Sequence, residues 1–316
     1  MKTVDLIVPC YNESEMIDLF YEKTAQVVSQ IDGYSFTFIF VDDGSTDDTL
    51  KKIKALAAAH EHVKYISFSR NFKKEAAMYA GLKTSTGDRV AIIDADLQHP
   101  PELIEPMLKA IDEEGYDSCS ARRVSREGEP KLRSAFARLF YKLINSMSEV
   151  EIVDGAVDFR MMTRQMVNAV LSLPEVQRFS KGIFCWVGFN TKWIEFKNIE
   201  RVAGESRWSF WSLLRYAIDG ITAFTTFPLR LATIFGTIVS LSAFIYLIAE
   251  LIKTLIFGST VSGYPSTIII MLFIGGIIIM ALGIIGEYLA RMYMETKRRP
   301  IFITRDTNIE ELHDDK

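Results

Sequence analysis

Short apolar runs alternate with helix-like segments over the first 120 residues of the chain. The runs are bounded by polar clusters and predict buried strands at Val4–Val8, Phe36–Val41, Val63–Phe68, Val90–Ile93 and Ser118–Ala121. Apolar positions with a helical period predict the intervening helices at Glu15–Ile31, Asp47–His60, Glu75–Lys83 and Glu102–Glu114. Because strand and helix alternate, the pattern predicts an α/β domain built on a parallel sheet.

Two long segments near the C-terminus carry no charged residue. Leu231–Ala249 and Thr267–Gly286 each approach the roughly 20 residues that cross a hydrocarbon layer of about 30 Å. Their connector, Gly258–Ser266, has no Lys or Arg, whereas basic residues flank the outer ends at Arg230, Arg291, Lys297, Arg298 and Arg299. This asymmetry predicts a transmembrane hairpin in the cell inner (cytoplasmic) membrane, with both termini cytoplasmic. The alternative is a helical hairpin buried in a soluble protein, which a domain of this size has little capacity to enclose.

Two further segments have an amphipathic pattern. Residues 131–147 place apolar side chains on one helix face and basic ones near the other, and residues 209–228 are rich in Trp, Phe and Tyr. Both are expected to lie at a membrane surface, with packing against the sheet as the alternative. The expected organisation is a cytoplasmic α/β domain over 1–208, an interfacial helix over 209–228, two membrane helices within 229–293 (about 229–256 and 266–290), and a cytoplasmic tail over 294–316 that is loosely ordered from Thr304 onward.

Composition narrows the class of protein further. The formal net charge of −4 gives no basic excess for nucleic acid. The three cysteines are far apart and predict reduced thiols in a cytosolic domain. Two membrane helices with much lipid-facing surface favour a homo-oligomer.

Polar clusters follow the predicted strands, where the ligands of parallel sheets bind. Asp94 and Asp96 emerge directly after the strand that ends at Ile93, and Mg²⁺ or Mn²⁺ prefers such oxygen ligands, with Gln98 as a further one. Asp94 is also suited to a ribose or a metal-bound water. A solvated turn is the alternative for such a pair of acids.

Two more clusters suit a nucleotide. Gly44 and Asp47 are explained by a turn and a helix cap, but the adjacent charges of Asp42 and Asp43 favour a partner that donates hydrogen bonds, such as a base imide or ribose hydroxyls. Arg70, Lys73 and Lys74 supply positive charge on the same predicted edge and are expected to contact phosphate.

Together, Pro9–Glu13, Val41–Asp47 and Asp94–Gln98 resemble in order and spacing the family 2 glycosyltransferases of GT-A (Rossmann-like) fold. With the two C-terminal spans and the stretch to Glu102, the chain resembles bacterial bactoprenol glucosyltransferases, relatives of dolichol-phosphate mannose synthase, over almost its whole length. Two positions depart from this pattern: Lys73 stands where relatives often have glycine, and Gly204-Glu205-Ser206-Arg207 stands for their Gly-x-Ser-Lys.

The resemblance implies a UDP-sugar donor, Mg²⁺ or Mn²⁺, and a polyprenyl-phosphate acceptor. The implied nucleotide-sugar ligands are Pro9, Tyr11, Glu13, Asp42, Asp43, Arg70, Lys74, Asp94 and Ala95. The metal ligands are expected among Asp94, Asp96 and Gln98, and Asp96 counts as catalytic for that reason.

Asp158 matches the place where relatives put an acid near the acceptor, so it is the candidate catalytic base, with Asp154 as the alternative. A surface ion pair between Asp158 and Arg160 is the reading without catalysis. Basic residues expected to meet the acceptor phosphate are Arg122, Arg126, Arg138, Arg201 and Arg207. The predicted reaction is an inverting transfer, most simply of glucose, for modification of a cell-envelope glycan. The alternatives are mannose or another hexose or amino sugar on the same lipid, and a non-catalytic membrane scaffold or nucleotide-sugar sensor.

Overall fold

The computed structural model describes residues 1–123, 145, 153, 155–173, 175–196, 222, 225–257 and 264–310. The chain divides into two compact units, which are taken separately below. The first contains Met1–Gly220 together with Arg299–Lys316, and the second contains Ile221–Arg298. Apart from residue 145, the expected helix at 131–147 lies outside the described residues, as does most of the expected helix at 209–228.

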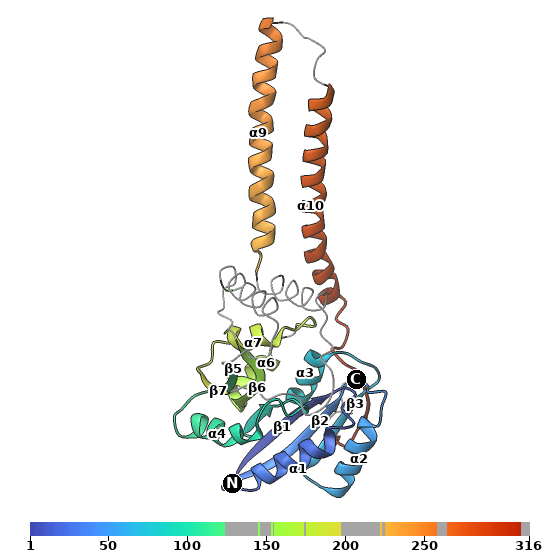
Figure 1. Ribbon diagram of the computed structural model, residues 1–316, viewed down its shortest axis with the longest axis vertical. Helices are drawn as coiled ribbons and strands as arrows, with labels where there is room; N and C mark the ends of the chain where they lie inside the picture. The colour runs from blue at the N-terminus through green and yellow to red at the C-terminus, as the bar shows by residue number, and fades with distance from the viewer. Residues whose placement is uncertain are drawn as a thin grey trace. The chain divides into compact units, whose positions relative to one another are not determined.

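An eight-stranded sheet organises the first unit (Figure 1). Its strands, in chain order, are β1 (Lys2–Cys10), β2 (Tyr34–Asp42), β3 (Val63–Phe68), β4 (Arg89–Ile92), β5 (Ser118–Arg123), β6 (Ala156–Thr163), β7 (Thr191–Phe196) and β8 (Thr304–Thr307). Their spatial order is β7-β5-β6-β4-β1-β2-β3-β8. The first four strands are parallel to one another, as predicted. The whole sheet is mixed, because β6 is antiparallel to both β4 and β5, and β8 is antiparallel to β3.

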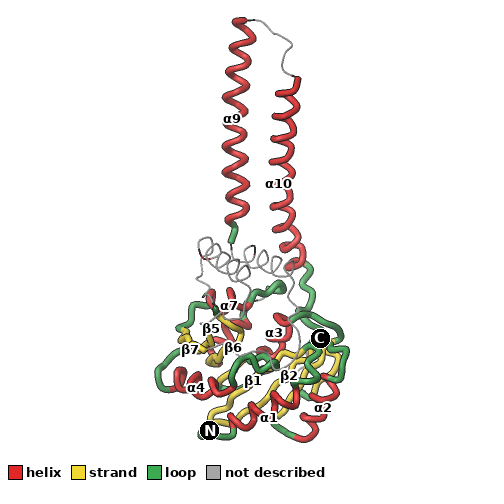
Figure 2. The backbone as a smooth tube through the Cα atoms, viewed as in Figure 1, coloured by secondary structure: helices red, strands yellow, loops and turns green. Residues whose placement is uncertain are grey.

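Helices cover both faces of this sheet, which is why β1, β2 and β4 are mostly apolar (Figure 2). The helical elements are α1 (Ile17–Val28), α2 (Thr49–Ala59), α3 (Lys74–Thr84), the 3₁₀ turn η1 (Pro101–Leu103), α4 (Ile104–Asp112), α6 (Arg164–Leu171) and α7 (Ser180–Trp186). Along β1, Leu6 and Val8 belong to the core that includes α1 and α4, whereas Ile7 faces α3. A Cβ atom on Gly81 of α3 would come within 2.2 Å of Ile7, so this helix packs closely against the sheet.

The end of the chain differs from its prediction. The expectation of a loosely ordered tail from Thr304 is wrong for the described residues, because β8 pairs with β3 and residues up to Glu310 follow it. Asn308 accepts a hydrogen bond from the backbone N–H of Tyr65 at 2.7 Å and donates one to the carbonyl of Val63 at 3.1 Å. Strand β8 therefore covers what would otherwise be the exposed edge of β3.

The second unit consists of two long helices that contact each other, α9 (Phe227–Phe257) and α10 (Tyr264–Thr296) (Figure 1). Each contains a stretch long and apolar enough to cross a membrane, Phe227–Tyr246 and Phe273–Thr296. Large apolar side chains such as Phe244 and Met271 are exposed, as expected for helices that face lipid.

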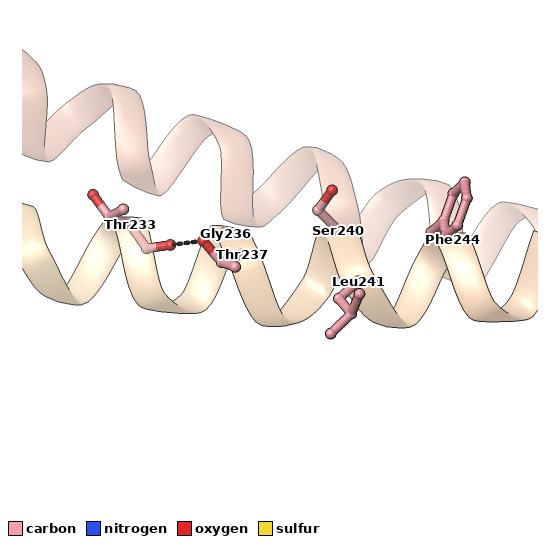
Figure 3. A pocket seen from close by; sticks show the side chains of 6 residues that line it. All are labelled: Thr233, Gly236, Thr237, Ser240, Leu241 and Phe244. Carbon is pink, nitrogen blue, oxygen red and sulfur yellow. Dashed lines mark hydrogen bonds between the residues drawn. The ribbon is translucent and has the colours of Figure 1, made fainter.

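One face of α9 carries a shallow pocket (Figure 3). It is lined by Thr233, Gly236, Thr237, Ser240, Leu241 and Phe244. The hydroxyls of Thr233 and Thr237 donate to the carbonyls of Leu229 and Thr233, at 3.0 and 2.8 Å. These hydroxyls are therefore satisfied within the helix, which suits an apolar surrounding.

Candidate active site

The loops after β1 and β2 are tied together by their polar side chains. Asn12, with φ +53°, accepts a hydrogen bond from the backbone N–H of Thr46 at 2.8 Å, and its own N–H donates to Ser45 Oγ at 2.9 Å. The N–H of Glu13 donates to Thr49 Oγ1 at 2.8 Å. The predicted ligands Tyr11 and Glu13 thus belong to a loop whose shape is fixed by the second loop, whereas Pro9 lies at the end of β1, paired with Val41.

Asp42 and Asp43 are both buried, and both accept hydrogen bonds from this chain. Asp42 accepts from the backbone N–H of Ser45 at 3.0 Å and from Ser67 Oγ at 2.7 Å. Asp43 accepts from the backbone N–H of Phe72 at 2.5 Å and is 3% exposed. Burial raises the pKa of Asp43 to about 6, against the opposing effect of the N–H groups of Phe72 and Lys73. Asp43 therefore shapes the third loop; its contact with a nucleotide stays a prediction.

The third loop, Ser69–Lys73, connects β3 to α3. Lys73 has φ +76° and ψ 162°, a backbone conformation that is essentially restricted to glycine. Arg70 folds back over Phe72, with its guanidinium carbon 3.9 Å from the ring centroid. The positive φ fits the glycine that the family resemblance leads one to expect at this position, and it makes Lys73 a strained residue.

Lys74, at the start of α3, joins two acids from different strands. Its Nζ lies 2.6 Å from Oδ1 and 2.8 Å from Oδ2 of Asp94, and 2.6 Å from Oδ2 of Asp158. Asp94 follows β4 and Asp158 lies on β6. These strands are antiparallel with Ile92 opposite Arg160, so continuing the register by two residues brings Asp94 opposite Asp158.

This cluster is strongly coupled electrostatically. Burial alone would raise the pKa of Asp158, but the ammonium groups of Lys74 and then Lys181 outweigh burial and hold that pKa well below its usual value. Burial would likewise lower the pKa of Lys74, yet Asp158 and Asp94 raise it. Asp158 is therefore ionised and paired with Lys74 at neutral pH. Arg160 is instead buried against the Phe184 ring, 4.0 Å from its centroid, and donates to Ser120 Oγ at 3.4 Å.

The predicted metal ligands lie together just after β4. Asp96 Oδ1 accepts the backbone N–H of Gln98 at 3.1 Å, and Ala95 between the two acids is buried. Within the described part of the chain, no group of three or more His, Cys, Asp or Glu side chains is arranged to hold a metal ion. Asp94 and Asp96 still fit a cation that binds one or two carboxylates and takes further oxygens from substrate phosphates and water.

Two residues of this region were not predicted from the sequence. His99 is buried between Phe159 and Phe196, with its Nδ1 3.9 Å from Asp94 Oδ2, and burial lowers its pKa. Glu75 accepts hydrogen bonds from the backbone N–H and the hydroxyl of Ser180, which joins the start of α3 to the start of α7. Burial raises the pKa of Glu75 to about 7. Both follow predicted motifs directly in sequence, and this adjacency was the available signal.

The predicted acceptor residues are only partly covered. Arg122 lies near the end of β5, which pairs there with Ala156 of β6, two residues before Asp158. The remaining candidates, Arg126, Arg138, Asp154, Arg201 and Arg207, lie outside the described residues.

A sheet covered by helices on both faces, with acids and a lysine gathered beyond the carboxyl ends of its parallel strands, places this chain among the α/β proteins whose ligands bind at that edge of the sheet. Residues 5–171 match the model of the family described as glycosyl transferase family 2. The chain belongs to this family and is a glycosyltransferase, which confirms the predicted GT-A fold.

Relatives match along nearly the whole chain. The protein CsbB of Bacillus subtilis (strain 168) is 46% identical over 97% of this chain and 92% of its own length. The prophage bactoprenol glucosyl transferase homolog of Escherichia coli (strain K12) is 41% identical, and the bactoprenol glucosyl transferase of Shigella phage SfX is 42% identical, each over 96% of this chain and 98% of its own length. Among solved structures, glucosyl-3-phosphoglycerate synthase from Mycobacterium tuberculosis aligns with 70% of this chain over 78% of its own length. The identity is 19% and the TM-score is 0.46, a likeness too distant to indicate a shared substrate.

Proposed function

We propose that the chain transfers glucose from UDP-glucose to a polyprenyl phosphate such as undecaprenyl phosphate, with inversion at the anomeric carbon. The observation that carries the proposal is the Lys74 ammonium, which bonds both Asp94 and Asp158. This contact joins Asp94, assigned to the donor, and Asp158, assigned to the acceptor. The relatives named as bactoprenol glucosyl transferases support the choice of sugar and lipid.

The proposed chemistry is a single displacement. A phosphate oxygen of the lipid forms a bond to the anomeric carbon while the bond from that carbon to the β-phosphate oxygen breaks and UDP leaves. A phosphate monoester has a second pKa of about 6, so the acceptor is largely ionised at pH 7 and needs little help from a base. The lowered pKa of Asp158 makes it a weak base. We therefore assign Asp158 to orienting the acceptor and holding Lys74.

Lys74 is the residue suited to the departing diphosphate. Its side chain is 41% exposed, and its ammonium lies between Asp94 and Asp158, where the diphosphate of the donor is expected to lie. Asp94, Asp96 and Gln98 would hold Mg²⁺ or Mn²⁺, which when bound would neutralise charge on the leaving UDP.

A membrane location follows from the lipid substrate. The helices α9 and α10 would anchor the enzyme in the inner membrane. Basic residues lie near the start of α9, at Arg230, and near and beyond the end of α10, at Arg291 and 297–299; they support cytoplasmic termini and a cytoplasmic site for the water-soluble donor. Association of lipid-facing helices would give a homo-oligomer.

The test uses the purified full chain in detergent with undecaprenyl phosphate and a panel of UDP-glucose, UDP-galactose, UDP-N-acetylglucosamine and GDP-mannose. Lipid-linked product is measured with and without EDTA, followed by addition of Mg²⁺ or Mn²⁺. Product is expected from UDP-glucose, with loss on chelation and recovery with either metal. Product from GDP-mannose alone would replace the proposed sugar, and no product from any donor would refute the transferase proposal.

A matched pair of variants tests the residues. Asp96→Asn is expected to lower turnover by roughly 100-fold, the scale of losing one electrostatic contact to the transition state. Asp88→Asn is the control, because Asp88 is an exposed acid at the amino end of β4 that bonds Thr3, and it should keep turnover near that of the parent. Equal activity of the two variants would exclude a role for Asp96.

A further inference from the structure

The segment that follows α10 returns to the sheet next to the third loop. After Thr296 the chain leads to Phe302 and Ile303 and then into β8. The carbonyl of Ile303 accepts a hydrogen bond from the backbone N–H of Ser69 at 2.9 Å. Ser69 is the first residue of the loop that connects β3 to α3, so the contact lies at the point where the loop leaves the sheet.

Phe302 contacts the elements on both sides of this loop. Its ring stacks on Phe68, the last residue of β3, with centroids 5.0 Å apart and planes 20° from parallel. It also meets the edge of Tyr79 on α3, with centroids 6.4 Å apart. Phe72, within the loop, packs edge-on against Phe68 at 5.8 Å. One half-buried aromatic ring thus connects the strand before the loop with the helix after it.

The loop is held from its other side by Asp43, which accepts the backbone N–H of Phe72. It carries Arg70 and leads directly to Lys74, the two basic residues assigned to the donor phosphates. A change in the distance between β3 and α3 would therefore move both cations relative to Asp94.

We propose that Phe302 is a positioning residue for the loop Ser69–Lys73 and thereby for binding of the nucleotide-sugar donor. The inference rests on the proposed function, because the loop is taken as the donor-phosphate loop. Phe302 does not touch the reacting atoms; it acts through Phe68, Phe72 and Tyr79. Removing the ring is expected to weaken donor binding more than it slows the bound complex.

The experiment measures the donor KM, the acceptor KM and kcat of the full chain with UDP-glucose and undecaprenyl phosphate, and UDP binding by calorimetry. Phe302→Ala is expected to raise the donor KM by about tenfold, with kcat changed less than about threefold and the acceptor KM unchanged. Phe302→Tyr keeps the ring and should restore the donor KM. Phe302→Leu keeps most of the packing volume and covers the case in which the alanine variant fails to fold.

Asn308→Ala is the matched control, since it removes two hydrogen bonds that hold the segment after β8 at the far end of β3. It is expected to lower stability without a change in donor KM. If the parent chain shows neither transfer from UDP-glucose nor UDP binding, the proposed function fails. If the parent is active and Phe302→Ala keeps the parental donor KM, or if Phe302→Tyr fails to restore it, the positioning role is refuted and the proposed function stands.

Discussion

Replacing Lys73 with glycine is expected to stabilise the protein. A non-glycine residue at φ +76° and ψ 162° stores strain of about 1–3 kcal/mol. Glycine relieves this strain, but it also raises the conformational entropy of the unfolded chain, which lowers stability by roughly 0.4–1 kcal/mol. The expected net gain is about 1 kcal/mol. For a domain of some 200 residues, a gain of this size raises the unfolding midpoint by about 2–4 °C.

Thermal unfolding of the purified variants in detergent measures this effect. Lys73→Ala is the control, because it removes the charge and the long side chain yet keeps a Cβ atom in the same backbone conformation. The alanine variant should therefore unfold at nearly the parental temperature. The strain argument is refuted if the glycine variant is no more stable than the alanine variant. The donor KM of both variants reports separately whether the Lys73 ammonium contacts the donor.

Three other substitutions test the site and its surroundings. Gly44→Ala should raise the donor KM, because a Cβ atom at this position would lie 2.5 Å from the backbone of Arg70. Gly33 also has a positive φ, but a Cβ atom there would have no atom within 4 Å, so Gly33→Ala should change stability alone. Equal donor KM values for the two variants would contradict this reasoning. Lys74→Met should lower turnover by roughly 100-fold and raise the pKa of Asp158, whereas an unchanged pH–rate profile would argue against their coupling. Burial raises the pKa of Glu75 from 4.5 to about 7, so its contribution to stability is present below pH 4.5 and lost as the pH rises through 7. Denaturant unfolding should show Glu75→Gln gaining stability relative to the parent between pH 5 and 8, by at most about 3 kcal/mol, and a pH-independent difference would refute the shift.

The sequence predicted the elements that bury apolar side chains on both faces. Strands β1 to β5 and helices α1 to α4 are found where the apolar runs and helical periods placed them, with shifts of at most three residues at their ends. Strand β6 was missed because it carries Asp158 and Arg160, which break the apolar pattern. Arg160 is nevertheless buried, its charge placed over an aromatic ring.

Strand β8 was missed for a different reason. Thr304–Thr307 has no apolar residue, and its position depends on backbone pairing with β3 and on Phe302, whose partners lie more than 200 residues earlier in the chain. Asp94 was found from its place after a strand, whereas Asp158 was found from the family resemblance. Both acids lie close to Lys74 because β4 and β6 pair in an antiparallel register, and this register cannot be read from the spacing of residues in the sequence.

Because β8 follows α10, translation of the last strand of the catalytic sheet comes after both apolar helices have been synthesised. A nascent chain that has not yet reached Thr304 leaves β3 as an unpaired edge, with its N–H and C=O groups open to other strands. Completion of the sheet is thus coupled in time to release of the hairpin from the ribosome. Chains halted between α10 and β8 would expose the unpaired edge of β3, and chaperones and proteases can recognise such an exposed edge.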